Sequence, residues 1–308
     1  MCDELTESDN ERFLAQVYPA QGHPAQGYPV DRRRFAALGA GAAVLAVAPG
    51  CVANPAPDAG ALPTASRAVT ITTPDGKADA FFVYPKSGKH AAVILWPDIA
   101  GLRDAYRTMG TRLASAGYAV LVVNQYYRSA PAPIMSSLSE WRTPAGQEKL
   151  KPMIAAITPA GTTSDAGAFV AWLDGQAEVD TKRKIGSAGY CMGGPFTVRT
   201  AVASPVRVGA AASFHGANLV NDTPDSPHKL LASTQASYLF AIAQNDDERA
   251  PGDKDALRAA AKAAGRAAEV EVYPAQHGWC TIDAPIYDQA QAEKAWGRML
   301  ALFKTALA

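Results

Sequence analysis

A cysteine surrounded by glycines is the residue in this sequence best suited to chemistry. Cys191 lies at the centre of Gly189–Gly194 (GYCMGG), after a short apolar run and before residues 195–203, which can form a helix. A sharp turn of this G-x-C-x-G type holds its central residue in a strained backbone, so its neighbours must be small. The sulfur then lies beside a helix N-terminus, which favours the thiolate. The motif predicts a nucleophilic cysteine, and a buried, inert cysteine in a glycine-rich loop is the alternative.

An aspartate and a histidine follow later apolar runs. Asp246 comes after residues 238–245, and His277 comes after residues 270–276. In a parallel sheet, reactive groups gather where strands end, so we expect both to lie near Cys191. An imidazole can take the thiol proton, and a carboxylate can fix the tautomer of that imidazole. Asp247 competes with Asp246 for the carboxylate role, and we favour Asp246 because it comes directly off the predicted strand.

From residue 67 onward, predicted strands and helices alternate as in a single α/β domain that runs to residue 308. This pattern predicts a mostly parallel, doubly wound sheet with helices on both faces, after an antiparallel hairpin over residues 69–84. Further strands are predicted over residues 91–96, 118–123, 184–188, 208–214, 238–243 and 268–273. Helices are predicted over residues 106–116, 147–157, 166–173, 253–264 and 289–307. The order nucleophile, acid, histidine is the order of the α/β-hydrolase fold.

Charge and cysteine content exclude several classes of protein. Lys+Arg and Asp+Glu both number 29, so the net charge is zero and we predict no nucleic-acid partner. The hydrophobic content of 48% is enough for a substantial core. The four cysteines lie far apart in the sequence and form neither a metal-ligand spacing nor a disulfide framework, so no metal site is predicted.

The first 66 residues differ in composition from the rest. Residues 1–30 are polar and repetitive, which predicts a disordered extension. Residues 31–66 combine a basic cluster, a short Gly/Ala-rich apolar run and a Pro-rich linker. Arg32-Arg33-Arg34-Phe35 before such a run resembles a bacterial twin-arginine signal, so we predict export to the periplasm or the medium by the twin-arginine machinery. Cys51 is a candidate lipid-anchor site, and a cut elsewhere in Val52–Ser66 is the alternative.

The catalytic motifs resemble those of the dienelactone hydrolase family. The residues that carry this resemblance are Gly189–Gly194, the Asn245-Asp246 turn, His277-Gly278-Trp279, Trp96–Leu102 (WPDIAGL) and Leu113–Tyr118 (LASAGY). It covers the chain from about Val69 to the end, and it is specific because a cysteine-centred turn with a double glycine is uncommon among α/β-hydrolases.

The resemblance implies hydrolysis of a small-molecule ester or lactone through a thioester on Cys191. His277, oriented by Asp246, would relay protons and activate water. The backbone N–H groups of Met192 and Ile99 would form the oxyanion hole. No metal or organic cofactor would be needed.

Two positions depart from the family pattern. A glutamate that pairs with the resting thiol in the family corresponds here to Asp98, which is one methylene shorter, so Asp98 is a candidate thiol partner or a loop-capping aspartate. No arginine follows His277, although family members that cleave dienelactone hold the substrate carboxylate with one there. Arg128, Arg142 and Arg199 occur elsewhere in the chain, and the sequence does not place them relative to the site.

Other functions remain open at this point. A thioesterase or a peptidase on the same fold would use the same three catalytic residues. A non-catalytic redox protein is the alternative from another class, because the Cys280 thiol, three residues past His277, can approach Cys191 and form a disulfide with it.

Overall fold

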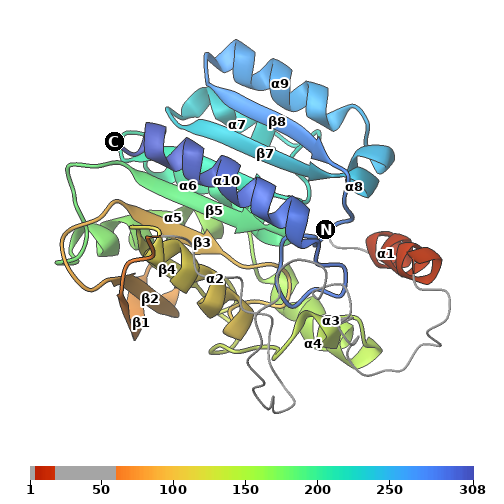
Figure 1. Ribbon diagram of the computed structural model, residues 1–308, viewed down its shortest axis with the longest axis horizontal. Coiled ribbons are helices and arrows are strands. Elements are labelled where there is room, and N and C mark those ends of the chain that lie inside the picture. The colour runs from red at the N-terminus through yellow and green to blue at the C-terminus, as the bar shows by residue number, and fades with distance from the viewer. Residues whose placement is uncertain (1–3, 18–59) are drawn as a thin grey trace, which may run out of the picture.

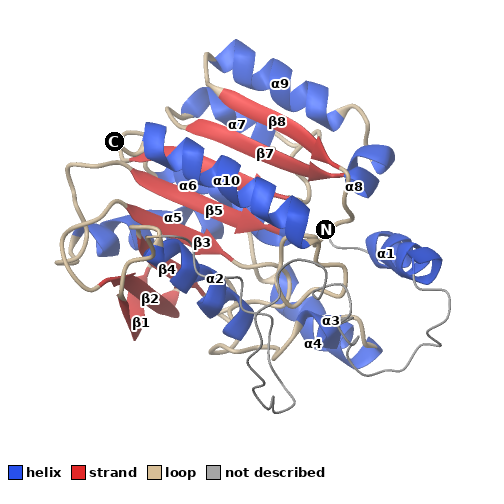
Figure 2. Ribbon diagram, viewed as in Figure 1, coloured by secondary structure: helices blue, strands red, loops and turns tan. Residues whose placement is uncertain are grey.

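An eight-stranded sheet forms the centre of the molecule (Figures 1 and 2). The computed structural model describes residues 4–17 and 60–308. The strand order is β1-β2-β4-β3-β5-β6-β7-β8. The strands are β1 (Thr64–Thr73), β2 (Gly76–Pro85), β3 (Ala92–Trp96), β4 (Ala119–Val123), β5 (Ile185–Tyr190), β6 (Val208–Phe214), β7 (Ser237–Ala243) and β8 (Ala268–Tyr273).

The sheet is antiparallel at one edge and parallel elsewhere. Strand β2 pairs antiparallel with both β1 and β4, and every pair from β4 to β8 is parallel. All residues of β3, β4 and β5 are buried, as expected for strands covered on both faces. The predicted hairpin and the mostly parallel, doubly wound sheet are confirmed.

Helices cover both faces of the sheet. Helices α2 (Asp104–Ser115) and α10 (Gln289–Ala306) pack on one face, whereas α5 (Pro159–Asp174), α6 (Gly194–Ala203) and α9 (Asp253–Ala264) pack on the other (Figure 1). The shorter elements are α3 (Leu138–Trp141), α4 (Pro144–Ala155), η2 (Cys191–Gly193), α7 (Pro227–Leu230), η3 (Leu231–Ser233) and α8 (Gln244–Arg249). No helix in the described ranges is long and apolar enough to cross a membrane.

The structure differs from the sequence prediction near the N-terminus. Residues Glu4–Val17 form helix α1, within the stretch whose composition predicts disorder. Asn10 and Leu14, one helical turn apart, are only 6% and 4% exposed. The composition of α1 alone does not favour a helix, so packing against the folded domain stabilises it. The predicted twin-arginine segment and the Cys51 lipid site lie outside the described residues.

Candidate active site

The turn after β5 has the strained geometry that its sequence predicts. Cys191 has a φ of +52°, a left-handed conformation that is uncommon for a residue with a side chain. It begins the short helix η2, and α6 follows at Gly194. Its side chain is 1% exposed. The turn thus holds Cys191 between the end of a central strand and the start of a buried helix.

The glycines of the motif are required by close backbone contacts. A Cβ on Gly189 would lie 2.1 Å from the carbonyl oxygen of Gly193. A Cβ on Gly193 would lie 2.5 Å from the carbonyl oxygen of Trp96, and one on Gly194 would lie 2.5 Å from the Cα of Gly216. These neighbours are backbone atoms of buried elements and cannot rotate away, so any side chain at these positions would push the turn off the sheet.

We expect Gly189→Ala to destabilise the protein by about 3 kcal/mol, because overpacking against fixed backbone is costly. This corresponds to a fall in Tm of about 6–12 °C for a domain of this size. Gly297→Ala in α10 is the matched control, since a Cβ there meets no atom within 4 Å, and it should raise stability by about 0.4–1 kcal/mol. Thermal unfolding followed by circular dichroism measures both. Equal Tm values for the two variants would contradict the strained-turn account.

The structure places Asp246 against the ring of His277. The Nδ1 atom of His277 lies 2.7 Å from Oδ2 of Asp246, and the backbone N–H of His277 donates to Oδ1 of Asn245 over 2.8 Å. Asp247 instead accepts from Lys254 Nζ at 2.7 and 2.8 Å. The two candidate carboxylates therefore have different partners, and only Asp246 is hydrogen-bonded to the histidine.

Cys191 and His277 converge in one pocket. The Sγ atom of Cys191 and one ring nitrogen each of His215 and His277 lie within 4.8 Å of one another. The pocket that contains them is also lined by residues of several loops and short helices, among them Asp98, Ile99, Leu138, Arg142, Ala284 and Ile286. Side chains that directly follow β5 and β6 thus meet one from the loop after β8, at the carboxyl ends of the parallel strands.

Cys191 is disulfide-bonded in this structure. The Cys191–Cys280 bond that the redox alternative requires is absent, because Cys280 is a free, buried cysteine. A disulfide sulfur offers no thiolate, so Cys191 can act as a nucleophile only in the reduced protein.

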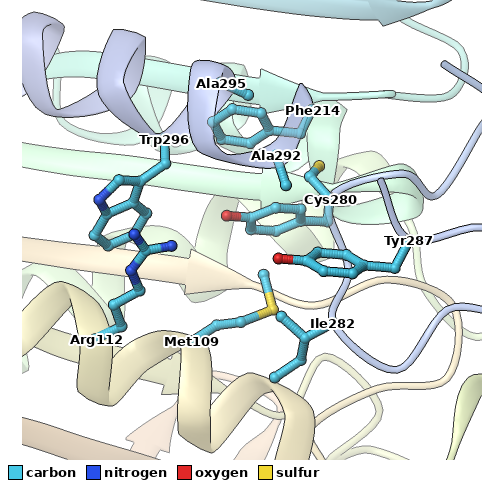
Figure 3. A pocket seen from close by; sticks show the side chains of 10 residues that line it. Met109, Arg112, Phe214, Cys280, Ile282, Tyr287, Ala292, Ala295 and Trp296 are labelled. Carbon is cyan, nitrogen blue, oxygen red and sulfur yellow. The ribbon is translucent and has the colours of Figure 1, made fainter. Parts of the chain in front are cut away.

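Cys280 belongs to a different pocket. Figure 3 shows its sulfur among side chains of α2 and α10, with Tyr287, Met109 and Phe214 nearby. Burial raises the pKa of the Cys280 thiol well above its ordinary value. The short sequence distance between His277 and Cys280 suggested that the thiols could meet, but the chain turns Cys280 into the apolar core on the face covered by α2 and α10. The redox reading based on a Cys191–Cys280 pair is therefore contradicted.

His215 also lines this pocket and is not among the candidate residues predicted from the sequence. It follows β6, is 1% exposed, and its ring centroid lies 4.7 Å from that of His277. In the described part of the chain neither of its ring nitrogens has a hydrogen-bond partner. Burial, with a smaller contribution from His277, lowers the pKa of His215 well below its ordinary value, so it is neutral at pH 7. Its position directly after a central strand was the available signal.

Of the two candidate oxyanion donors, one lines the pocket with Cys191 and the other is the next residue in the chain. Ile99 is 2% exposed and lines the pocket, and Met192 follows Cys191 in η2. Tyr126 donates its hydroxyl hydrogen to the Ile99 carbonyl over 2.7 Å, which fixes the orientation of this loop. Among hydrogen bonds of the described residues, none uses the Ile99 N–H. The Ile99 N–H, one of the two predicted oxyanion donors, is therefore held in place by its neighbours and is not used by another hydrogen bond among the described residues.

Asp98 has a cationic partner in the structure. Arg103 donates to Oδ1 and Oδ2 of Asp98 at 2.7 and 2.9 Å, and it also binds both oxygens of Asp283 at 2.7 Å. The side chain of Arg103 is fully buried, and that of Asp98 is 2% exposed. Asp98 also accepts a hydrogen bond from the N–H of Ala100. Of the two roles that the sequence leaves open for Asp98, thiol partner and loop-capping residue, this contact is the loop-capping one. A contact between Asp98 and the thiol stays a prediction, and it would compete with this bidentate ion pair.

Of the three candidate arginines, only Arg142 lines the pocket. Arg128 is bound by Asp75 and Asp165, and Arg199 lies 3.7 Å from Asp225. Arg142, at the end of α3, is therefore the arginine in a position to meet an anionic group in the pocket.

The sheet order, the strained cysteine turn and the histidine at the strand ends define an α/β-hydrolase. The model of the Dienelactone hydrolase family matches residues 78–307, so the chain belongs to this family. It is accordingly a hydrolase that acts on ester or lactone bonds.

Relatives agree with this assignment. A "Putative carboxymethylenebutenolidase" of Methylorubrum extorquens is 26% identical over 77% of this chain and 79% of the relative. A "Probable 2-oxo-3-(5-oxofuran-2-ylidene)propanoate lactonase" of Bradyrhizobium sp is 25% identical over 52% of this chain and 61% of that protein. The solved structure of a "Putative Dienelactone Hydrolase" from Klebsiella pneumoniae matches in fold with a TM-score of 0.68, at 22% identity, over 79% of this chain and 99% of the other.

Proposed function

We propose that the protein hydrolyses a carboxylic ester or lactone through a thioester on Cys191. The observation that carries this proposal is the convergence of Cys191 and His277 in one pocket, with Asp246 against Nδ1 of the histidine. In the Cys-His-Asp arrangement, each group has the partner that its task requires.

Acylation begins from the reduced protein. The Nε2 atom of His277 takes the thiol proton, and Sγ of Cys191 attacks the carbonyl carbon. The oxyanion that forms is stabilised by the backbone N–H groups of Ile99 and Met192. When the C–O bond breaks, His277 returns the proton to the leaving oxygen, and the acyl group remains on Cys191 as a thioester.

Deacylation repeats the same steps with water. His277 removes a proton from water as its oxygen attacks the thioester carbon, and His277 then returns this proton to Sγ of Cys191 as the C–S bond breaks. Asp246 stabilises the imidazolium in both halves, since its Oδ2 lies 2.7 Å from Nδ1. The products are a carboxylic acid and an alcohol, and for a lactone both groups are on one molecule.

We propose a lactone or a small ester as the substrate class. The names of the Methylorubrum and Bradyrhizobium relatives describe a butenolidase and a lactonase, which favours a small cyclic ester. The pocket is lined mainly by apolar groups, including Ile99, Leu138 and Ile286, with Arg142 as its cationic side chain. An apolar body with one anionic group matches this lining.

An activity screen over esters, lactones and thioesters tests this function. The full chain is reduced with dithiothreitol, exchanged into buffer, and compared with the same protein after thiol alkylation. Turnover of p-nitrophenyl acetate and of at least one lactone, lost on alkylation, is the expected result. Turnover of thioesters alone would favour the thioesterase alternative, and ester turnover that survives complete alkylation would exclude Cys191 as the nucleophile.

We also propose export through the twin-arginine machinery, supported by the basic cluster and apolar run in residues 31–48. A variant with Arg32→Lys and Arg33→Lys keeps the charge but removes the paired guanidinium groups. In a bacterial host we expect this variant to remain in the cytoplasm while the unmodified chain reaches the periplasm. Cell fractionation and immunoblotting measure both. Equal periplasmic recovery of the two chains would contradict the proposal.

A further inference from the structure

Helix α1 contributes to the same pocket as the candidate catalytic residues. Asn10 lines that pocket together with Cys191, His215 and His277. Its Nδ2 atom donates to the carbonyl oxygen of His277 over 3.0 Å, and its Oδ1 accepts from Nδ2 of Asn245 over 3.4 Å. An amide side chain from residue 10 thus bridges the loop that carries the histidine and the turn that precedes Asp246.

Two ion pairs flank this bridge. Asp9 accepts from Arg249 over 2.7 Å, and Glu11 accepts from Arg142 over 3.1 Å. Both arginines belong to the rim of the site: Arg142 lines the pocket, and Arg249 also lies 3.6 Å from Asp246. Three consecutive residues of α1 therefore contact three separate parts of the site.

The charges of α1 complement the surface that it covers. Its sequence ELTESDNERFLAQV carries four acidic residues and one basic residue, and the contacts across the interface pair its carboxylates with arginines. Figure 1 shows α1 beside α8, at the end of the sheet where the parallel strands finish, and separate from the helices that cover the two faces. It is therefore positioned over the reactive end.

We propose that α1 is a built-in cap that competes with substrate for the active site. In the closed form, α1 covers Cys191 and occupies Arg142, the pocket arginine available to an anionic substrate. Opening requires the loss of two ion pairs and one buried amide bridge, together with exposure of the Leu14 side chain. This inference rests on the proposed function, because it regulates the same nucleophile.

The position of α1 in the chain gives the cap a means of release. It precedes the proposed export signal in residues 31–66, so a cut in the predicted Val52–Ser66 stretch would separate α1 from the catalytic domain. The cap would then keep the hydrolase closed until export and leave with the signal.

The rate at which iodoacetamide alkylates Cys191 tests the cap without relying on ester turnover. The reduced full chain is compared with a variant that carries Asp9→Lys, Asn10→Ala and Glu11→Lys, and alkylation is followed on the peptide that contains Cys191 by mass spectrometry. We expect alkylation about tenfold faster in the variant, with kcat/KM for p-nitrophenyl acetate higher by about the same factor. Higher salt should speed alkylation of the wild-type chain and have little effect on the variant, because screening weakens the two ion pairs.

Two controls assign the effect to docking. Ala15→Lys with Gln16→Lys also adds positive charge to α1, but at exposed positions away from the contacts, and should leave alkylation unchanged. A synthetic peptide of residues 4–17, added to the triple variant, should slow alkylation again, whereas a peptide with the same three changes should not.

The outcomes separate this inference from the proposed function. Equal alkylation rates in the wild-type chain and the triple variant would overturn the cap. A fall in kcat/KM in the variant would also overturn it, since α1 would then complete the substrate pocket rather than close it. Faster alkylation with no hydrolysis of any ester or lactone would leave the cap standing and reject the proposed hydrolysis.

Discussion

Replacing Cys191 by alanine is expected to lower kcat for ester hydrolysis by about 10⁴- to 10⁶-fold, which is the scale of losses when a catalytic nucleophile is removed. The reason is that no thioester can form without Sγ, and what remains is the contribution of binding and of the oxyanion donors. The measurement is kcat with p-nitrophenyl acetate under reducing conditions, supported by circular dichroism to show that the variant folds.

Cys280→Ala is the matched control for that variant. Both cysteines are buried, but Cys280 lines the pocket between α2 and α10 and is a free thiol. We expect Cys280→Ala to keep the wild-type kcat. Loss of activity in Cys280→Ala, with activity retained in Cys191→Ala, would show that Cys280 is the nucleophile and would contradict the proposed mechanism.

Asp246→Asn is expected to lower kcat by about 10⁴-fold while leaving the fold intact. In the wild-type chain, Oδ2 of Asp246 lies 2.7 Å from Nδ1 of His277. The amide nitrogen of an asparagine at this position would donate a hydrogen bond to that Nδ1 atom. The ring is then held in the tautomer with its proton on Nε2, where it cannot accept the proton of Cys191. Rapid-quench kinetics should show slower acylation and slower deacylation, because both steps use the same nitrogen.

Asp247→Asn provides the comparison, because it makes the same chemical change one residue along the chain. Asp247 binds Lys254 rather than the histidine, so its loss should cost only about 0.2–1 kcal/mol of stability and leave kcat near wild type. If both variants lost activity equally, a general effect on α8 would explain the result better than a specific role for Asp246.

The sheet and the order of the candidate catalytic residues were predictable from local patterns. The continuous apolar runs at residues 91–96 and 118–123 predict strands buried on both faces, and they form β3 and β4. The glycine pattern around Cys191 predicts the turn because backbone contacts forbid side chains there, and the structure places backbone atoms of Gly193, Trp96 and Gly216 at those positions. Chain order and strand ends then bring Asp246 and His277 to the same edge.

Features that depend on distant contacts could not be predicted in this way. The Arg103–Asp283 pair joins residues 180 positions apart, and its effect on Asp98 follows from three-dimensional packing. Helix α1 is polar and short, so its composition predicts disorder. Its contacts with the folded domain, including the buried Leu14 and the pairs with Arg142 and Arg249, reveal why it forms. The short helices between residues 129 and 163 were only partly predicted for the same reason.

The central claim is that the acyl group passes through a covalent bond to Cys191. Mass spectrometry of the reduced full chain, acid-quenched during the first turnover with p-nitrophenyl acetate, tests this most directly. The account predicts one acetyl group per chain, located on the peptide that contains Cys191 and absent from Cys191→Ala. An acetyl group on another residue, or product release at the full rate with no acetylated protein at any time, would contradict it.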